Sequence, residues 1–155
     1  AQRLSALRLL LILLVFLVIP ITTIVVVMPA YNAAKTLEDT FRAIPSGYYD
    51  EVVVVDDFSR DDTVAQAQRL NLKAIRHPHN VGYGGNQKTC YMEALRDGAD
   101  IVVMLHPDGQ YDPAIIPEMI QPIREGRADM VLGSRMAIPG GSCARTRSEV
   151  AMTKR

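Results

Sequence analysis

Short, unbroken runs of Val and Ile alternate along this chain with stretches of helical periodicity, and this alternation constrains the fold more than any other feature. Such runs are typical of parallel strands that helices cover on both faces. The sequence therefore predicts an α/β domain with a mainly parallel sheet between helices. The predicted strands, of which the third is the weakest, are 24–28, 52–55, 73–76, 101–105 and 129–133.

Helix signals fill the intervals between the predicted strands. Apolar residues recur at helical spacing, and Pro or Gly residues mark the ends. Strand and helix thus alternate over about 110 residues, and such units connect by right-handed crossovers. Ligands of these sheets bind beyond the carboxyl ends of the strands, so we expect the functional residues there. The predicted helices are 33–44, 62–70, 85–97 and, after a short turn, a kinked helix from about Pro117.

Length, cysteine content and charge exclude several classes of protein. The chain has 155 residues, enough for one domain with a sizeable core. Its two cysteines exclude a disulfide framework and a four-cysteine zinc site. Residues 24–141 carry 11 basic and 16 acidic residues, which does not suit a nucleic-acid-binding protein. This acidic balance does suit a carboxylate-rich site that holds a cation.

The two ends of the chain differ from residues 24–141, which we take as the domain. Residues 1–23 contain an apolar run, Leu9–Ile19, that extends back to Leu4 and gives 16 residues before Pro20. A membrane span needs roughly 20 residues, so three interpretations stay open: a membrane anchor, a signal peptide, or a leader outside the fold. A signal peptide is the least favoured, because no A-x-A-like cleavage site follows. Residues 142–155 are basic and lack apolar periodicity, so we expect an irregular tail.

Polar residues follow the first two predicted strands. The first is followed by Pro29-Ala30-Tyr31-Asn32, and we expect the strand to stop at Pro29, because proline cannot extend a central ladder. By itself this stretch is an ordinary turn with a helix cap. After the second strand, Asp61 and Asp62 suit a helix N-terminus. Asp56 and Asp57 lack that explanation, and a carboxylate at this edge can bind a base or ribose hydroxyls.

The third strand is followed by a glycine-rich stretch, Asn80–Asn86, with Gly82, Gly84 and Gly85. It matches neither the Walker A sequence nor the dinucleotide-binding fingerprint. Three glycines in four residues indicate sharp turns and close backbone approach at a helix N-terminus. Two interpretations stay open here: proximity to a phosphate, or tight packing of the helix on the sheet.

The fourth and fifth strands are followed by the remaining candidates. His106, Asp108 and Gln110 alternate along one segment and can face one pocket if the segment is extended. Oxygen ligands of this kind suit Mg²⁺ or Mn²⁺, which bind through one or two carboxylates with substrate phosphates and water. The alternative is a β-turn built on Pro107 and Gly109. Arg135, after the fifth strand, is a candidate anion clamp.

Together these motifs resemble the family 2 glycosyltransferases of GT-A fold, and among them the polyprenyl-phosphate (dolichyl-phosphate) mannose or glucose synthases. The resemblance covers about Ile24 to Gly141. It implies a GT-A, Rossmann-like domain preceded by a hydrophobic N-terminal segment. It rests on three motifs in the family's order and spacing: Val27–Asn32, Val54–Thr63 and Val131–Arg135.

The resemblance also implies roles for individual residues. It assigns a divalent metal, Mg²⁺ or Mn²⁺, to the segment 106–110. Asp108 falls on the second Asp of the family's Asp-x-Asp motif, Gln110 on an amide ligand, and His106 replaces the first Asp. Asp108 and Arg135 would take part in catalysis, Arg135 by approaching phosphate. The residues that would bind the nucleotide sugar are Pro29, Ala30, Tyr31, Asp56, Asp57 and Asp108.

The implied reaction transfers a hexose from a UDP- or GDP-sugar to a polyprenyl phosphate at the cytoplasmic face of a membrane. Two alternatives stay open: a nucleotide-sugar-binding fragment without activity, and a nucleotidyltransferase. A nucleotidyltransferase would have a glycine-rich and basic loop after the first strand, and Pro29–Asn32 is neither glycine-rich nor basic. The sequence lacks an evident acceptor side, so we expect donor binding with little or no transfer by these residues.

Overall fold

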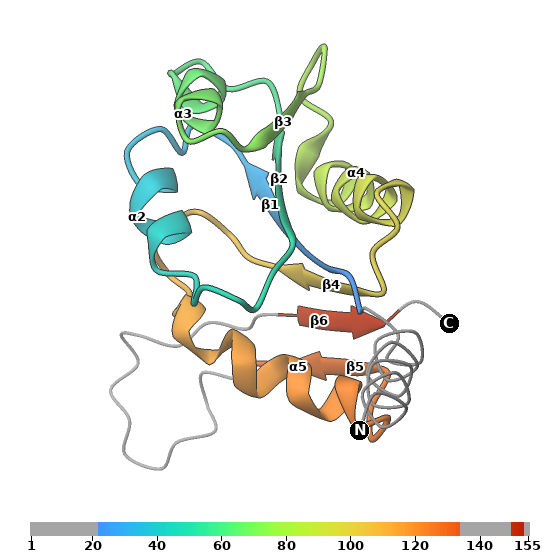
Figure 1. The fold of residues 1–155 in the computed structure, drawn as a ribbon. Coiled ribbons are helices and arrows are strands. Elements are labelled where there is room, and N and C mark those ends of the chain that lie inside the picture. The colour runs from blue at the N-terminus through green and yellow to red at the C-terminus, as the bar shows by residue number, and fades with distance from the viewer. Residues whose placement is uncertain (1–21, 134–149, 154–155) are drawn as a thin grey trace, which may run out of the picture.

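The computed structural model describes residues 22–133 and the backbone of 150–153. They form one six-stranded sheet in the order β3-β2-β1-β4-β6-β5 (Figure 1). The pairs β1–β2, β1–β4 and β2–β3 are parallel, and β6 is antiparallel to both β4 and β5. The predicted α/β class with a mainly parallel sheet is confirmed. The strands are β1 Ile24–Ala30, β2 Glu51–Asp56, β3 Lys73–Arg76, β4 Ile101–Met104, β5 Met130–Leu132 and β6 Val150–Thr153.

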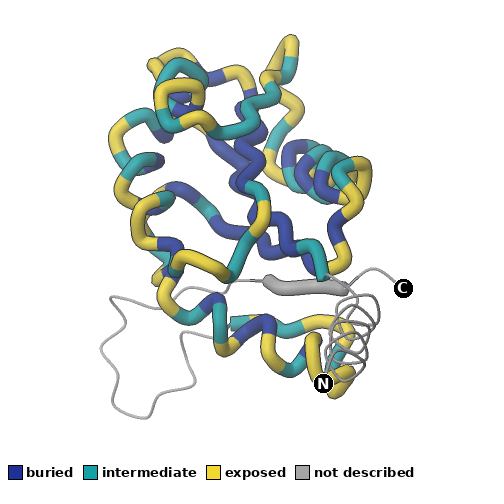
Figure 2. The backbone as a smooth tube through the Cα atoms, in the orientation of Figure 1, coloured by how far each residue is buried: buried dark blue, intermediate teal, exposed yellow. Residues whose placement is uncertain are grey.

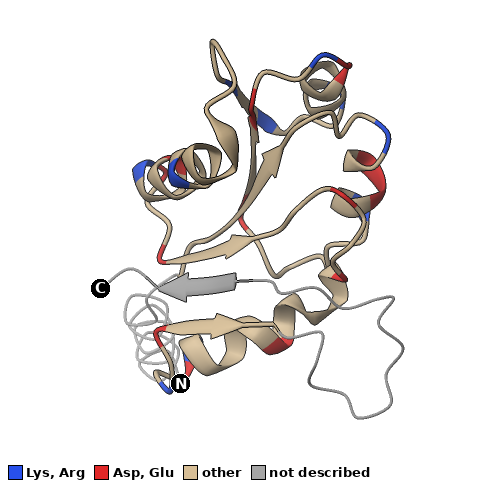
Figure 3. Ribbon diagram, turned by 180° about the vertical axis from the view of Figure 1, so that it is seen from behind, with Lys and Arg blue, Asp and Glu red and all other residues tan. Residues whose placement is uncertain are grey.

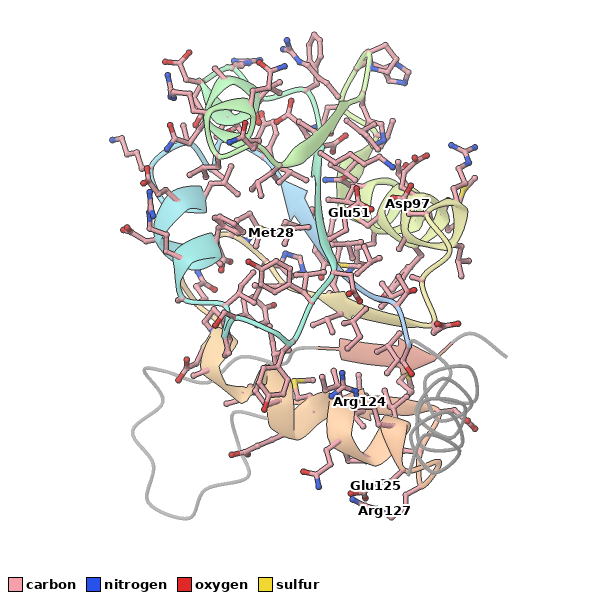
Figure 4. All side chains as sticks on the ribbon, viewed as in Figure 1. Met28, Glu51, Asp97, Arg124, Glu125 and Arg127 are labelled. Atoms are coloured by element: carbon pink, nitrogen blue, oxygen red, sulfur yellow. The ribbon has the colours of Figure 1, made fainter. Side chains whose placement is uncertain are left out.

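Helices cover both faces of the sheet. The helix α4 packs on one face through Cys90 and Ala94, while α2, α3 and α5 pack on the other, where Leu37, Ala67 and Ile120 are buried. The C-terminal end of α4, where Asp97 lies (Figure 4), is also tied to β3, because Lys73 Nζ lies 2.6 Å from Asp97 Oδ2. The helices are α2 Leu37–Arg42, α3 Thr63–Arg69, α4 Gly82–Arg96, the 3₁₀ helix η1 Pro113–Ile115 and α5 Ile116–Arg124.

Strand β1 lies at the centre of the core, and all seven of its residues are buried (Figure 2). Its side chains alternate between the two faces. Met28 packs on the side of α2, and Val27 packs on the side of α4. The charged residues of β2 and β3 stand at the ends of these strands, and β1 and β4 carry none (Figure 3). Burial on both faces explains why the apolar runs are continuous rather than alternating.

We expected the first strand to end at Pro29, but Pro29 lies within β1, opposite Val55. Leu105 N donates to Val27 O at 2.9 Å, so the backbone N–H and C=O groups of the odd-numbered residues in β1 point toward β4. The backbone nitrogen of Pro29 also points toward β4, but Pro29 lies past the last pair of that ladder, Val27 opposite Met104. The missing N–H of proline therefore breaks no hydrogen bond of the ladder.

The irregular tail expected at 142–155 contains a strand, which corrects that expectation. Val150–Thr153 forms β6, inserted between β4 and β5. Its four residues pair in antiparallel register, with Val150 opposite both Met104 and Leu132. A strand held by ladders on both sides gains backbone hydrogen bonds that depend on its neighbours, and a run of four residues gives little periodicity to detect.

The remaining differences concern the helix ends and the N-terminal segment. Helix α2 begins at Leu37 rather than at Ala33, and residues 34–36 form a turn before it. Ala33 N donates to Thr63 Oγ1 at 2.8 Å, which ties this turn to the loop after β2. Pro122 lies inside α5, which follows η1 directly. Residues 1–21 of the predicted leader lie outside the described residues. Within the described part of the chain, no helix has the length and apolar character to cross a membrane.

Candidate functional site

A pocket of about 360 Å³ opens at the carboxyl ends of β1, β2 and β4. This is the edge at which parallel α/β sheets bind ligands. The pocket brings together five of the predicted nucleotide-binding residues from three separate loops. It is lined by Pro29, Ala30, Tyr31, Asn32, Ala33, Thr36, Asp57, Asn80, Gly82, Tyr83, Asn86, His106, Pro107 and Asp108.

The loops after β1 and β2 are fastened to each other at the wall of the pocket. Asp57 N donates to Ala30 O at 2.9 Å, which continues the β1–β2 ladder past the end of β2. Asn32 N then donates to Ser59 Oγ at 2.8 Å, and Asn32 Oδ1 accepts from Arg60 N at 2.9 Å. Asn32 has a left-handed backbone with φ 52°, which asparagine tolerates better than most residues. These bonds fix the turn that exposes Tyr31 beside the pocket.

Asp57 is buried, and its carboxylate organises the loop that precedes α4. Its Oδ1 accepts from His77 Nδ1 at 2.9 Å and from Val81 N at 2.8 Å, and its Oδ2 accepts from Gly82 N at 3.0 Å. Burial by itself would raise the pKa of Asp57. The two backbone N–H groups and His77 outweigh this effect and hold the pKa of Asp57 below its ordinary value. Asp57 is therefore ionised at neutral pH while it lines the pocket.

Asp56 lies apart from the pocket, although it directly precedes Asp57. Its side chain is fully buried, and it is not one of the residues that line the cavity. Oδ2 accepts from Ser59 N at 3.0 Å and lies 3.4 Å from Arg76 Nε, and Oδ1 has no partner. The geometry thus gives the two neighbouring carboxylates different environments, because successive residues of a strand point to opposite faces.

The glycine-rich stretch forms the N-terminal turn of α4. Its first N–H groups, at Val81 and Gly82, donate to Asp57, so a protein carboxylate occupies the position that attracts anions at a helix N-terminus. Gly85 is closely packed within this turn, because a Cβ atom there would lie 2.8 Å from Cγ2 of Val81. Val81 is the N-cap of α4 itself, so this contact does not come from packing of the helix on the sheet.

The segment after β4 carries the predicted metal ligands. Asp108 is exposed, lines the pocket, and accepts from Gln110 N through Oδ1 at 3.0 Å. Gln110 Oε1 is buried without a hydrogen-bond partner. Thr36 Oγ1 donates to Pro107 O and ties this segment to the start of α2. The alternative interpretation of this segment, a β-turn built on Pro107 and Gly109, is supported in part, because Gly109 has a left-handed backbone with φ 71°.

His106 is half-buried and stacks with two tyrosine rings. Its ring centroid lies 5.4 Å from that of Tyr83 and 5.1 Å from that of Tyr111. Its Nε2 lies 3.2 Å from Tyr83 Oη. Burial lowers the pKa of His106, and the negative charge of Asp108 acts in the opposite direction with a smaller effect.

A divalent cation fits this end of the pocket by the chemistry of the side chains. Asp108 supplies a carboxylate at the pocket. Gln110, two residues further along the chain, is not among the residues that line the pocket, and its Oε1 is a buried oxygen acceptor without a hydrogen-bond partner. Mg²⁺ and Mn²⁺ sites commonly take one or two protein carboxylates and complete the shell with phosphates and water. Among the described residues, no group of three or more His, Cys, Asp and Glu could hold a metal ion alone. The residues therefore fit a cation that takes most of its ligands from a bound diphosphate.

Several pocket residues were not found by sequence reasoning. Asn86 is buried, donates from Nδ2 to Val55 O at 3.0 Å, and leaves Oδ1 without a partner. Tyr83 and Asn80 also line the cavity. Their position after the third strand was the available signal, and only the glycines of that stretch received an interpretation. Arg135, the expected anion clamp, lies outside the described residues.

Comparison with known protein families gives one match across most of the chain. The family described as glycosyl transferase family 2 matches residues 25–153. The match includes β6 and so extends past Gly141, where the resemblance seen in the sequence ended.

Curated relatives and solved structures also resemble the chain. The chain is 32% identical to the UDP-N-acetylglucosamine–dolichyl-phosphate N-acetylglucosaminyltransferase of Methanococcus voltae, over 75% of this chain and 53% of that protein. It is 35% identical to the dolichol-phosphate mannosyltransferase of Pyrococcus furiosus, over 75% of this chain and 34% of that protein. The chain thus spans about half the length, or less, of these curated relatives.

Glucosyl-3-phosphoglycerate synthase of Mycobacterium tuberculosis, solved with Mn²⁺, UDP and phosphoglyceric acid, superimposes with a TM-score of 0.66. The alignment covers 85% of this chain and 56% of that one at 24% identity. At this identity the likeness shows the fold, which agrees with the GT-A expectation from the sequence.

Proposed function

This chain belongs to glycosyl transferase family 2 and has the GT-A fold, and from that premise we propose that it binds a nucleotide-diphosphate sugar for hexosyl transfer to a polyprenyl phosphate. The observation that carries the proposal is the pocket at the carboxyl ends of β1, β2 and β4. It joins the Pro29–Tyr31 turn, the ionised Asp57 and the exposed Asp108 around one cavity. The dolichyl-phosphate transferases among the relatives support the acceptor class.

The residues of this pocket have distinct parts in the proposed reaction. Tyr31 and the Pro29–Ala30 backbone offer a flat, half-apolar wall for a base, and Asp57 stiffens the floor through the loop before α4. Asp108 and Gln110 would hold a divalent cation, Mg²⁺ or Mn²⁺, which neutralises negative charge on a diphosphate. The Mn²⁺ and UDP in the synthase structure support this cofactor class.

In the transfer step, the bond between the sugar C1 and the diphosphate oxygen breaks, and a bond from C1 to an acceptor oxygen forms. A phosphate monoester has a second pKa near 6, so at neutral pH its oxygen is largely ionised and attacks without a general base. This agrees with a pocket in which Asp57 holds the loop before α4 and Asp108 is proposed to hold the cation, so that neither carboxylate has to act as the base. A lipid-linked acceptor would bring the protein to a membrane surface, and we expect the cytoplasmic face.

Calorimetric titration with nucleotides tests the proposal. We expect the full chain to bind UDP or GDP in the presence of Mn²⁺, and to bind the corresponding monophosphate more weakly. Asp108→Asn should lower the diphosphate affinity at least tenfold, about 1.4 kcal/mol or more. Asp112→Asn is the matched control. Asp112 is also exposed, caps η1 by accepting from Ala114 N, and lies outside the pocket lining, so its affinity should stay within twofold.

Two results would contradict the proposal. Equal affinities of the wild type and Asp108→Asn would remove the metal assignment. Failure to bind either diphosphate at any Mn²⁺ concentration would remove donor binding itself. The acceptor class is tested separately with radiolabelled donor and a short polyprenyl phosphate, beside the matching polyprenol. Any transfer should favour the phosphate, because the alcohol oxygen is not ionised at neutral pH.

A further inference from the structure

Arg76, the last residue of β3, contacts three residues at the end of β2 and in the loop that follows it. Its Nη2 donates to Ser59 O at 3.0 Å, and its Nε lies 3.4 Å from Oδ2 of the buried Asp56. Its Cζ lies 5.3 Å from the centroid of the Phe58 ring. All four residues lie outside the pocket lining. One half-exposed side chain thus holds three positions of the chain beside the pocket.

The turn that Arg76 holds has a strained backbone. Phe58 has φ 66°, in the left-handed region that a bulky L-residue rarely adopts. Its side chain is 44% exposed, so burial of the ring in the core does not offset this strain. Such a conformation persists only where the surroundings impose it. Here Asp56 Oδ2 accepts from Ser59 N at 3.0 Å, and Arg76 binds Ser59 O and covers the Phe58 ring. The shape of this turn therefore depends on Asp56 and Arg76.

Ser59 connects the turn to the wall of the pocket. Its Oγ accepts from Asn32 N at 2.8 Å, and Arg60 N, one residue further, donates to Asn32 Oδ1 at 2.9 Å. Asn32 directly follows Tyr31, and both residues line the pocket. Contacts therefore run without a gap from Arg76 through Ser59 to the turn that carries Tyr31. A shift of Ser59 would disturb the bonds to Asn32 and move the aromatic wall.

We propose that Arg76 is a positioning residue for the nucleoside of the donor, because it holds the Phe58–Ser59 turn in the shape that sets Tyr31 against the base. The inference rests on the proposed function and deepens it. It assigns Arg76 and its buried partner Asp56 to the half of the pocket that receives the base, although neither touches the ligand. Asp108 lies on a different loop, after β4, so the requirement for the cation should not depend on Arg76.

Amide hydrogen exchange of the full chain tests the contact network without any ligand. In Arg76→Gln, which removes the charge and the guanidinium group, the amides of Asn32 and Arg60 should exchange about fivefold faster, because their bonds open locally. The amide of Asp50, which donates to Ile24 O at 2.8 Å at the opposite edge of the sheet, should keep its rate. An equal change at all three amides would mean that Arg76 contributes only to global stability, and would overturn the inference.

Nucleotide titrations at saturating Mn²⁺ measure the effect on the pocket. Arg76→Gln should weaken UDP, or GDP, by about fivefold or more, in the range for residues that act through a packed network. It should weaken the monophosphate, measured by displacement of the diphosphate, by the same factor. Asp108→Asn should instead affect the diphosphate more than the monophosphate. Arg69→Gln is the matched control, since Arg69 is exposed and bonds Gln66 of its own helix. Its affinities should stay within twofold.

A second substitution tests whether Arg76 acts through the strained turn. Glycine adopts the left-handed region about as readily as the right-handed one. Phe58→Gly should therefore recover most of the donor affinity that Arg76→Gln loses, when the two changes are combined. A double variant that binds as weakly as Arg76→Gln alone would show that the turn does not transmit the effect, and the inference would fail.

The remaining outcomes are also decisive. Equal donor affinities of the wild type and Arg76→Gln would overturn the inference. So would a loss confined to the diphosphate, or a tenfold rise in the Mn²⁺ concentration for half-maximal binding at saturating UDP, because either would place the effect at the cation. If the wild type binds none of these nucleotides, the proposed function fails instead. The exchange rates of Asn32 and Arg60 then still decide whether Arg76 holds the turn.

Discussion

Two adjacent carboxylates at the end of β2 illustrate how much a single residue's surroundings determine. Asp56 and Asp57 are indistinguishable in the sequence, and both were expected at the nucleotide. Asp57 lines the pocket and receives three hydrogen bonds, whereas Asp56 is buried on the other side with Arg76 as its cationic neighbour. The pleat of the strand separates them, so the site takes one carboxylate of the pair.

The hydrogen bonds of Asp57 lead to a prediction about stability. In Asp57→Asn, the amide cannot accept at both oxygen positions, and one of the N–H groups of Val81 and Gly82 then faces an NH₂ group. We expect a loss of about 2 kcal/mol, typical of buried hydrogen bonds to a charged group. Asp62→Asn, at an exposed residue that caps α3 without a side-chain bond, should change the stability little. Urea unfolding at pH 6 measures both.

The pH dependence of that difference follows from the depressed pKa of Asp57. A carboxyl whose folded pKa lies below the unfolded value, ordinarily 3.8, contributes its full stabilisation above the unfolded pKa. That contribution is lost as the pH falls through the folded pKa. The gap between wild type and Asp57→Asn should therefore be constant near pH 6 and shrink below about pH 4. A gap that does not depend on pH would mean that the charge of Asp57 has no part in it.

At the scale of the element, the glycines in the N-terminal turn of α4 are not equivalent. Gly82 has φ 79°, a left-handed conformation, and its N–H donates to Asp57. Gly84 has an ordinary helical backbone and open space where a Cβ would stand. The sequence shows the two as equivalent members of one glycine cluster, and only the backbone conformation separates them.

Alanine substitutions at these two positions should have opposite effects. Gly82→Ala should cost about 1–2 kcal/mol, because an L-residue resists the left-handed region. Gly84→Ala should gain about 0.5–1 kcal/mol, because it reduces the freedom of the unfolded chain and suits a helix. Thermal or urea unfolding of the two single variants gives the comparison. Losses of equal size would show that the left-handed φ of Gly82 does not distinguish the two positions energetically.

On the scale of the whole molecule, the sheet combines a parallel half with an antiparallel half. Strands β3, β2, β1 and β4 carry the pocket at their carboxyl ends, and β6 joins β4 to β5. Among the described strands β5 pairs only with β6, so the short β5 depends on β6 for its connection to the rest of the sheet, whereas α5 also packs on the core directly through Ile116 and Ile120.

Removal of β6 should therefore destabilise the molecule. A chain that stops after Gly141 leaves the β4 edge unpaired and deprives β5 of its partner. We expect a lower urea midpoint than for the full chain, together with greater amide exchange in β4. A chain that lacks only Lys154 and Arg155, which follow β6, is the control and should unfold like the full chain. An unchanged midpoint after the longer truncation would show that β6 adds nothing to stability.

The sequence alone determined the fold class, the positions of the first five strands along the chain and the edge at which the pocket lies, because continuous Val and Ile runs have few alternatives to strands covered on both faces. Tyr31, Asp57 and Asp108 could be placed at that edge because they follow strands, and Pro29 because it lies near the end of β1. Tertiary structure alone decided which carboxylate enters the pocket, that Asp57 caps α4, and that Tyr83 and Tyr111 both stack with His106. It also placed β6, whose four residues pair between two strands distant in sequence. These features arise from contacts across long sequence separations, and local periodicity carries no record of such contacts.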